Sequence, residues 1–500
     1  MSTIIVVENV SRWPLHVPGT HVVSARKYLT DPGFSVLRKA AVYNMCRHYG
    51  YQTTGYYVSL LAAARGHRPL PSVATLQDLR ISPLIRIASD DLHDMIRRSL
   101  AQIKSEEYLL SIYFGRNVAA RYDRLAQALF NMFPAPFLRA RFEYSDGWRL
   151  QSIRPIPTSE IPESHRPFVI ERAREYFSSG ARPRRRSKEA RYDLAILTNP
   201  EEPFPPSDSL AIRRFVAAAR EMGIAASVVT SDDAARIAEF DALFLRETTL
   251  VDHPTYRIAR RAAAAGLVVI DHPDDILRCT NKVYQAEVFS RHQIACPRTM
   301  VVHADNLDKV AAEVGLPCVL KRPDSSFSQG VVKADDPDEL KAHLDTFLEE
   351  SDLVIAQEFI PSAFDWRIGV LDGAPLYACR YHMASGHWQI IGKSGKGKTT
   401  YGPVEAVPMK HVPPRAVRLA QRAARAIGDG LYGIDIKEVG RRFLVVEVND
   451  NPTMESGCED VVIGNELYLA VMRSFRRRLD ARGAGRSHRT TRPRPKGSAR

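Results

Sequence analysis

Short apolar runs alternate with helical stretches between residues 192 and 275. Four runs have the length and composition of buried strands: 193–197, 224–229, 242–245 and 267–270. Apolar residues recur at helical spacing before Gly223, and a second helical stretch, 256–265, ends at Gly266. This alternation predicts right-handed βαβ crossovers and a parallel sheet. Because no Gly-x-Gly-x-x-Gly motif follows the first run, a dinucleotide-binding domain is a weak interpretation.

The N-terminal part of the chain, up to about residue 180, has a mixed pattern. Residues 4–7 predict a strand, 34–47 have helical spacing, and 51–60 are rich in tyrosine and threonine, which is typical of a strand. We therefore expect a mixed α/β unit. Five tyrosines gather here: Tyr43, Tyr49, Tyr51, Tyr56 and Tyr57. They fit a binding surface, but packing in a core and against strands is the simpler explanation.

Two basic stretches divide the chain. Residues 181–191 carry a net charge of +5 and residues 481–500 carry +7, out of +13 for the whole chain. Both are rich in Pro, Gly, Ser or Arg and poor in apolar periodicity, which is typical of a linker and a tail. We therefore predict five parts: an N-terminal accessory domain at 1–180, a basic linker at 181–191, an α/β domain at 192–275, a larger domain at 276–480 and a basic disordered tail at 481–500.

Charge and composition limit the classes of partner. Outside the two basic stretches the chain is close to neutral, so the folded part shows no overall excess of charge for a nucleic-acid backbone. The tail fits a solvated segment, and it also fits a segment that binds RNA. With 45% hydrophobic and 25% charged residues, the chain resembles an ordinary globular protein. Its longest apolar run, 262–270, is far shorter than the about 20 residues of a membrane span.

The location of the protein follows from the same observations. The start of the chain lacks the basic residues of a signal peptide, so we expect a cytoplasmic protein with no membrane partner. The six cysteines form no Cys-x-x-Cys pair, which argues against a disulfide framework and a cysteine-based zinc site. The sequence is compatible with a homo-oligomer but does not specify one.

The sharpest local signal is a predicted hairpin near the C-terminal end, where 433–437 and 444–449 flank a turn at Gly440. Side chains alternate along strands. One face is therefore expected to bury Ile434, Ile436, Val446 and Val448, and the other to carry Asp435, Glu447 and Asn449. Oxygen ligands of this kind suit Mg²⁺. The pattern equally fits the solvated face of an amphipathic hairpin, so both interpretations stay open.

A lysine at the end of an apolar run gives a second signal. Lys321 directly follows the apolar run 317–320, and a loop of small residues comes after it at 325–331. A strand-borne lysine next to such a loop offers one point charge and several backbone N–H groups to a phosphate chain. With a single glycine in the loop, an ordinary hairpin explains the pattern as well.

A third motif, from Gly392 to Thr399, satisfies the P-loop pattern G-x-x-x-x-G-K-[ST]. That pattern binds phosphate only where a helix starts directly after it, because the helix N-terminus meets the phosphates. Thr400-Tyr-Gly-Pro follows here, and no helix can start cleanly at that point. A basic loop that closes over an anion is the better interpretation.

Taken in order along the chain, these motifs resemble an ATP-grasp ligase. The resemblance covers about residues 192–475 and is to RimK-type ligases, specifically the longer subgroup with an extra N-terminal domain. It implies an α/β fold class with α+β lobes. The 276–480 region would be the ATP-grasp domain, and the parallel α/β domain at 192–275 would precede it. Residues 1–180 would be the RimK-like N-terminal accessory domain.

The resemblance also implies the nucleotide-binding residues. The two lysines on the triphosphate are Lys282, which follows Asn281, and Lys321. The loop that covers the phosphates contributes Ser328, Gln329 and Gly330. The hinge that receives adenine is Gln357, Glu358, Phe359 and Ile360. Asp365 matches the acid that contacts ribose.

The same resemblance implies the reacting centre. Arg367 and Arg380 match the cations that face the reacting phosphates, and Asp435, Glu447 and Asn449 match the metal-binding triad. Arg367 also fits a structural ion pair with Asp365, two residues away on the same strand face. ATP and Mg²⁺ are the expected cofactors, with two ions and with Mn²⁺ as an alternative metal.

The implied activity is that of an ATP-dependent carboxylate–amine ligase, which forms an amide or peptide bond through an acyl phosphate. RimK-type ligases add glutamate to ribosomal protein tails, so the expected substrates are glutamate or another amino acid and a protein or small-molecule acceptor. One departure concerns the acceptor: Gln389, Ile390 and Ile391 stand where the typical glutamate ligase has an arginine-serine-asparagine run.

Two other classes of function use the same motifs. A small-molecule kinase would need the same metal and lysines but would release ADP without free phosphate. A non-catalytic ATP-binding protein, with the basic tail bound to RNA, is the third class. Phosphate release that depends on both an amino acid and a second substrate would separate the ligase from both.

The P-loop pattern generates a first prediction. Lys398→Ala should weaken ATP binding by less than about 3-fold, whereas Lys321→Ala should weaken it by about 10-fold or more, since only Lys321 follows a buried strand. Calorimetric titration of both variants with ATP ranks the two effects. Loss of binding in the Lys398 variant alone would restore the P-loop interpretation.

Overall fold

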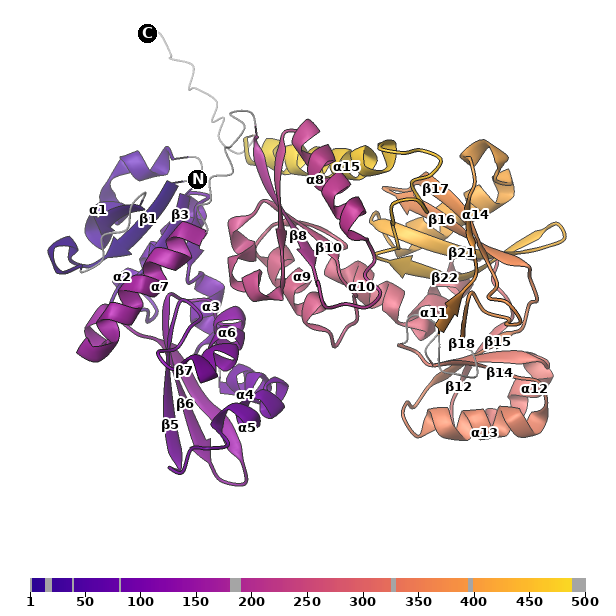
Figure 1. Ribbon diagram of the computed structural model, residues 1–500, viewed down its shortest axis with the longest axis horizontal. Coiled ribbons are helices and arrows are strands. Elements are labelled where there is room, and N and C mark those ends of the chain that lie inside the picture. Colours follow the sequence, from indigo (N-terminus) through magenta and orange to yellow (C-terminus); the bar gives the residue numbers. More distant parts are fainter. Residues whose placement is uncertain are drawn as a thin grey trace, which may run out of the picture. The chain divides into compact units, whose positions relative to one another are not determined.

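The computed structural model describes residues 2–13, 20–37, 40–80, 82–179, 190–324, 330–393 and 399–487. The chain forms two compact units (Figure 1). Unit 1 consists of Met1–Arg186 with Asp232–Glu239, and unit 2 of Ser187–Ser231 with Phe240–Arg500. No helix of the described residues is long and apolar enough to span a membrane.

The described residues of unit 1 form two sheets. The first is parallel, in the order β2-β1-β3-β4: β1 (Ser2–Val7), β2 (Thr20–Ser24), β3 (Ala40–Asn44) and β4 (Arg68–Leu70). The second is antiparallel: β5 (Glu107–Tyr113), β6 (Phe137–Tyr144) and β7 (Trp148–Pro155). The α-helices among the described residues of this unit are α1 (Ala25–Thr30), α2 (Thr54–Ala64), α3 (Val73–Asp78), α4 (Ser82–Asp91), α5 (His93–Leu100), α6 (Asp123–Met132) and α7 (Arg166–Ser179). The strand predicted at 4–7 is confirmed.

Two predicted elements of unit 1 are wrong. The helix expected at 34–47 contains strand β3, whose five residues are all buried, so the two-residue alternation of a half-exposed strand is missing. The strand expected at 51–60 is largely helix α2, where Val58 and Ala62 are buried at a spacing of four. Burial on both faces of β3 therefore hid the strand signal.

Unit 2 begins with the predicted parallel sheet, in the order β11-β10-β8-β9. Its strands are β8 (Tyr192–Thr198), β9 (Ile224–Val229), β10 (Ala242–Arg246) and β11 (Val268–Ile270). Helices α8 (Ser209–Glu221) and α9 (Pro254–Ala264) connect them. All strand pairs are parallel, as predicted. The C-terminal helix α15 (Glu466–Ser487) packs on α8, with the rings of Phe215 and Tyr468 4.8 Å apart.

Two antiparallel sheets follow. The smaller has the order β12-β15-β13-β14: β12 (Thr299–Val302), β13 (Cys318–Lys321), β14 (Val331–Ala334) and β15 (Val354–Glu358). The larger has the order β20-β17-β16-β21-β22: β16 (Phe364–Leu371), β17 (Ala374–His382), β20 (Val404–Ala406), β21 (Leu431–Val439) and β22 (Arg442–Asp450). The other helices are α10 (Pro273–Thr280), α11 (Lys282–Arg291), α12 (Val310–Glu313), α13 (Pro337–Leu348) and α14 (Pro414–Ile427).

The predicted hairpin at 433–449 is confirmed, with one correction. Strands β21 and β22 pair across a turn at Gly440, which has the positive φ of 58° that favours glycine. A β-bulge between Asp435 and Ile436 shifts the register, so Val445 occupies the buried face and Val446 turns to the opposite one. The expectation that Val446 is buried with Ile436 is therefore wrong by one residue.

The P-loop pattern is followed by a strand. Its central residues, 394–398, lie outside the described residues, and β18 (Ile391–Lys393) and β19 (Thr399–Tyr401) pair on either side of them. No helix begins in the described residues directly after the motif, as predicted. The helix N-terminus that a P-loop needs is therefore not supplied here.

A fully buried arginine ties the parallel sheet to the end of β22. Arg246 donates to Ser207 Oγ at 3.0 Å, to Asn451 Oδ1 at 2.7 Å and to the carbonyl oxygen of Pro452 at 2.9 Å. Burial lowers the pKa of Arg246 to about 10, and buried Asp271 offsets part of this effect. A buried guanidinium is tolerated only when such partners replace its water.

Arg246 generates a stability prediction. Arg246→Met should lower the unfolding free energy of unit 2 by about 3 kcal/mol, because the Ser207 and Asn451 side chains and the Pro452 carbonyl lose a buried donor. Arg213→Met, on the exposed side of α8, is the matched control and should change it by less than about 0.5 kcal/mol. Denaturant titration of both variants measures the difference. Equal stability would show that the buried contacts contribute little.

Candidate active site

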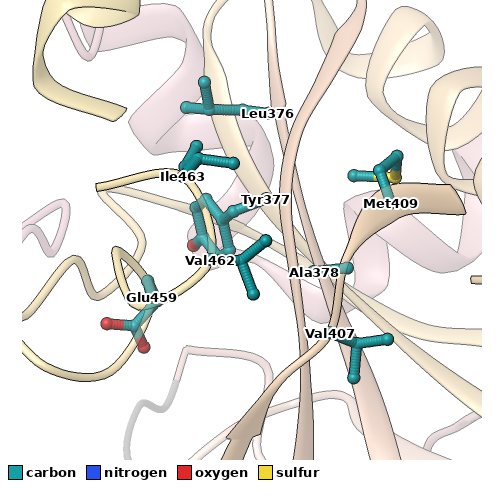
Figure 2. A pocket seen from close by; sticks show the side chains of 8 residues that line it. All are labelled: Leu376, Tyr377, Ala378, Val407, Met409, Glu459, Val462 and Ile463. Atoms are coloured by element: carbon teal, nitrogen blue, oxygen red, sulfur yellow. The ribbon is translucent and has the colours of Figure 1, made fainter. Parts of the chain in front are cut away.

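One large cavity, of about 590 Å³, opens in unit 2. Both antiparallel sheets line it: β13, β14 and the end of β15 from the smaller sheet, and β16, β21 and β22 from the larger. The residues that follow β8 and β10 line it as well, at 203–206 and 248–250. Its volume is in the range of ligand-binding pockets. A second hollow, beside β17 (Figure 2), has about 20 Å³, which is enough for a water molecule only.

The cavity brings together most of the residues predicted from the sequence. Those that line it are Lys282, Lys321, Gln357, Glu358, Phe359, Ile360, Asp365, Arg367, Asp435, Glu447 and Asn449. Gly330 is described, directly before the lining residue Val331. Ser328 and Gln329 lie outside the described residues, so their predicted role stays a prediction.

Arg380 does not line the cavity. It lies opposite Trp366 in the β16–β17 register, whereas Asp365 and Arg367, the neighbours of Trp366, belong to the cavity face. Its guanidinium lies 4.9 Å from the Trp366 ring centroid and 3.3 Å from a Glu405 carboxylate oxygen. Because opposite residues of an antiparallel pair share a face, Arg380 occupies the face away from the predicted phosphates. The expectation that it faces them does not match this position.

The three predicted metal ligands lie side by side. Asp435 is directly opposite Glu447 in the β21–β22 register, and Asn449 Nδ2 lies 3.2 Å from Asp435 Oδ2. Arg367 donates to both carboxylate oxygens of Asp435. Burial raises the pKa of Asp435 to about 6, against the opposing effect of Arg367.

These residues fit a hard cation. Two carboxylates and an amide oxygen are ligands that Mg²⁺ accepts, and Mg²⁺ completes its shell with water and substrate phosphates. No group of three His, Cys, Asp or Glu side chains in the described residues could hold a metal by itself. A cation here would therefore depend on the Asn449 amide and on ligands from the substrate.

The cations of the cavity are held in place by polar partners. Lys321 Nζ lies 2.8 Å from Gln357 Oε1 and is almost fully buried. Burial lowers the pKa of Lys321 to about 8, although nearby Glu447 opposes this shift. Burial alone would raise the pKa of Glu447, but the positive charges of Lys282, Lys321 and Arg367 keep this pKa below its usual value. Lys282, Lys321 and Glu447 are thus electrostatically coupled.

The sequence analysis missed a further cation, Lys437. Its Nζ lies 2.7 Å from Asp365 Oδ1 and 2.7 Å from Ser362 Oγ. Arg367 pairs with Asp435, so no ion pair between Arg367 and Asp365 is present among these contacts. Lys437 stands two residues after Asp435 on the same strand, and the alternation that selected Asp435 could have found it.

Aromatic and apolar side chains line the cavity beside residues 357–360. The rings of Phe359 and Trp388 meet edge to face at 5.8 Å, and Lys333 Nζ lies 5.1 Å from the Phe359 centroid. Ile390 and Ile391, which depart from the typical RimK sequence, also line the cavity. Flat aromatic and apolar surfaces suit a planar heterocycle.

Two family models match the chain. The RimK-like ATP-grasp N-terminal domain matches residues 25–172, and the RimK-like ATP-grasp domain matches residues 279–468. The "Alpha-aminoadipate--LysW ligase LysX" of Saccharolobus solfataricus is 30% identical over 196 residues, which are 37% of this chain and 67% of that protein. The "Probable alpha-L-glutamate ligase" of Parasynechococcus marenigrum is 27% identical over 226 residues, 44% of this chain. The match spans 46% of the length of that second relative.

Solved structures resemble a little more than half of this chain at low sequence identity. The structure titled "RimK domain protein ATP-grasp" from Sphaerobacter thermophilus has 17% sequence identity and a TM-score of 0.43. It is matched over 56% of this chain and 98% of its own. The assignment of the fold therefore rests on the family models and on the elements described above.

Lys321 generates a prediction about pH. With a pKa of about 8, the lysine is mostly charged at pH 7 and mostly neutral at pH 9, so ADP affinity should fall as pH rises through this range. Lys321→Arg should remove this dependence, because a guanidinium stays charged throughout. Calorimetric titration with metal-free ADP at both pH values measures it. The same fall in both proteins would assign the dependence to another group.

Proposed function

Because this chain belongs to the RimK-like ATP-grasp family, we propose that it is an ATP-dependent carboxylate–amine ligase that works through an acyl phosphate. The observation that carries the proposal is the single cavity that collects cations and oxygen ligands. Its cations are Lys282, Lys321, Arg367 and Lys437, and its oxygen ligands are Asp435, Glu447 and Asn449. This combination suits a triphosphate and its metal.

ATP would lie along the smaller sheet. The hinge at 357–360, with Trp388 beside it, would receive adenine, and Asp365 with its partner Lys437 would contact the ribose. Lys321 and Lys282 would contact the phosphates. Lys282 starts helix α11, so the positive end of the helix adds to the charge of the lysine.

Asp435, Glu447 and Asn449 would hold Mg²⁺, with two ions as the proposed number. When bound, the metal would supply positive charge that offsets the charge of the phosphates. Arg367 is already fixed by Asp435, so its guanidinium is oriented toward the same region without a metal. Such preorganised charges lower the barrier because they need not reorient during the reaction.

The proposed chemistry has two steps. A substrate carboxylate oxygen attacks the γ-phosphorus, and ADP leaves with the electrons of the broken P–O bond. An amine then attacks the acyl carbon, a C–N bond forms, phosphate leaves, and the amine loses a proton. No protein nucleophile takes part in this scheme. The cavity cysteines Cys279 and Cys458 fit that role poorly, because burial raises the pKa of both thiols.

The substrates are proposed from the relatives' names, which specify a glutamate ligase and an aminoadipate ligase. We propose that an amino acid, with glutamate as the first candidate, is joined to a protein or small-molecule acceptor. The part of the cavity that contacts the acceptor would include Gln389, Ile390 and Ile391. These residues would favour a different acceptor, because they replace the arginine-serine-asparagine run of the typical RimK ligase with a mostly apolar one.

The test follows product formation. Purified protein with Mg–ATP, hydroxylamine and each of the twenty amino acids should form a hydroxamate, because hydroxylamine traps an acyl phosphate. A pooled amino-acid and peptide mixture should give condensation masses. ADP formed without hydroxamate or free phosphate would favour a kinase and overturn the ligase proposal.

Glu447 generates a prediction about activity. Glu447→Gln should lower the rate of ADP formation by at least about 100-fold, because a neutral amide loses most of the attraction for the metal. The melting temperature should change little. Glu438→Gln, on the adjacent strand but outside the cavity lining, is the control. Near-normal ADP formation by the Glu447 variant would remove Glu447 from the metal site.

A further inference from the structure

Helix α14 carries four exposed arginines on one side, which we call the α14 row. Arg415, Arg418, Arg422 and Arg425 follow each other at spacings of three, four and three residues, so they lie along one face of the helix. The row is about 15 Å long at the rise of an α-helix. The opposite face of α14 is apolar and packs on β16, β21 and β22.

The sequence around the row contains no acid. Residues 406–428 include five lysines and arginines and no aspartate or glutamate. The acids that stand directly before and after this stretch are Glu405 and Asp429, and they form ion pairs with Arg380 and Arg478. The charge of the row is therefore not offset by its neighbours in the sequence.

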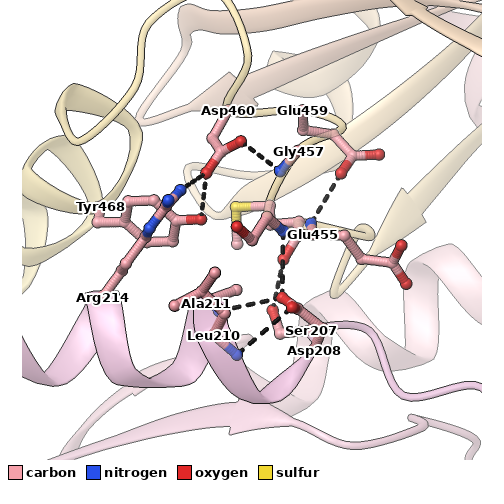
Figure 3. Close-up of polar contacts among 12 residues, drawn as sticks. Ser207, Asp208, Leu210, Ala211, Arg214, Glu455, Gly457, Glu459, Asp460 and Tyr468 are labelled. Atoms are coloured by element: carbon pink, nitrogen blue, oxygen red, sulfur yellow. Dashed lines mark hydrogen bonds and ion pairs between the residues drawn. The ribbon is translucent and has the colours of Figure 1, made fainter.

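Other helical arginines of unit 2 have acidic partners. On α8, Arg214 pairs with Asp460 (Figure 3), and on α15, Arg482 pairs with Asp241. The four arginines of the row, by contrast, form no ion pair with any residue that the structure describes. Arg422 donates to two backbone carbonyl oxygens just after α11, which leaves its charge in place. The row thus presents several uncompensated positive charges to solvent.

The row also opposes the stability of its own helix. Like charges three or four residues apart on a helix repel each other. Arg415 lies in the first turn of α14, where the helix dipole favours an acid, and this turn contains none. Helix α13 has Asp338 and Glu339 in its first turn. Helix stability therefore does not explain the row, whereas a bound polyanion would offset both effects.

The composition of α14 favours phosphate groups as the ligand. Arginine binds a phosphate through two parallel N–H···O bonds. Interfaces with folded proteins have an apolar core, and a helix binds a membrane surface by inserting apolar side chains. None of the large apolar side chains that are exposed in the described residues lies on α14. These observations disfavour a folded protein and a membrane as partners.

The length of the row indicates a nucleic acid rather than a small phosphate compound. One strand of a duplex presents a phosphate every 3.4 Å or so along its axis, so about four phosphates match the row. Single strands are usually bound by stacking their bases on aromatic side chains, and α14 contains no aromatic residue. A duplex that is contacted through its backbone fits both observations.

We propose that the α14 row binds the phosphate backbone of a nucleic-acid duplex, independently of its base sequence. The average charge of the folded part is close to neutral and conceals this local patch. The row lies on the side of the larger sheet opposite the cavity, because α14 packs on the face that holds Trp366 and Ile434. The proposal therefore does not depend on the ligase activity.

The experiment measures binding of a fluorescein-labelled RNA duplex of about 20 base pairs to the full chain, by fluorescence anisotropy at about 0.05 M and about 0.2 M salt. The combined variant Arg415→Gln, Arg418→Gln, Arg422→Gln and Arg425→Gln should bind about 10-fold or more weakly at the lower salt. The slope of log K against log[salt] should become shallower by about 3 to 4, because about four fewer phosphates are neutralised. A DNA duplex of the same sequence should bind wild type within about 3-fold of the RNA duplex, since only phosphates are contacted.

Two further variants of the row keep the test decisive. Lysine at all four positions retains the charge and should bind more tightly than the glutamine variant. Arg415→Gln with Arg418→Gln leaves the carbonyl contacts of Arg422 intact and should lose about 3-fold or more. Melting temperature and ADP affinity should stay at the wild-type values in every variant, which excludes unfolding as the cause.

The matched control removes the same charge from the basic tail, by glutamine substitution of Arg489, Arg492, Arg494 and Arg500. It should lose less than about 3-fold, because the proposal assigns binding to the row and not to the total charge. A loss in the row variant no larger than in the tail variant would overturn the proposal. Equal competition by polyglutamate or by anionic phospholipid vesicles would assign the row to another class of partner and overturn it as well.

Discussion

The register of three antiparallel strands determines the positions of most charged groups in the cavity. Strands β16, β21 and β22 pair so that Asp365 lies opposite Lys437, Arg367 opposite Asp435, and Asp435 opposite Glu447. Asp365 and Arg367 thereby each face a residue of opposite charge on the neighbouring strand. Asp435 also faces Glu447, the second carboxylate that is predicted to bind the metal. If the register of any of these strand pairs shifted by one residue, the charged side chains of the shifted strand would move to the opposite face of the sheet, which packs on α14.

Several charged side chains of the cavity are paired with each other before any ligand arrives. Asp365 pairs with Lys437 and Asp435 pairs with Arg367, and Lys321 donates a hydrogen bond to the neutral side chain of Gln357. Isolated buried charges are costly, so this pairing is what allows several to share one cavity. Part of the charge of the cavity is thus paired within the protein.

The sequence predicted the parts of the fold whose pattern is local. The strands and helices of 192–270 and the hairpin at 433–449 follow from alternation and from glycine stops, and the structure confirms them. Strand β3 was missed because both of its faces are buried. Val446 occupies its face of the sheet because of a bulge, and Arg380 occupies its face because of the way its strand pairs with β16. Neither position can be predicted from the residues next to it in the sequence.

The buried guanidinium of Arg246 bears on how this chain could be recombined with others. It enters from β10 of the parallel sheet, and its partners Asn451 and Pro452 belong to the segment after β22, some 200 positions later in the sequence. A chimera that exchanged only 192–275 would place a foreign side chain against those acceptors or leave them unbonded. A stable chimera therefore has to take both segments from the same parent sequence, or replace both sides of the contact together.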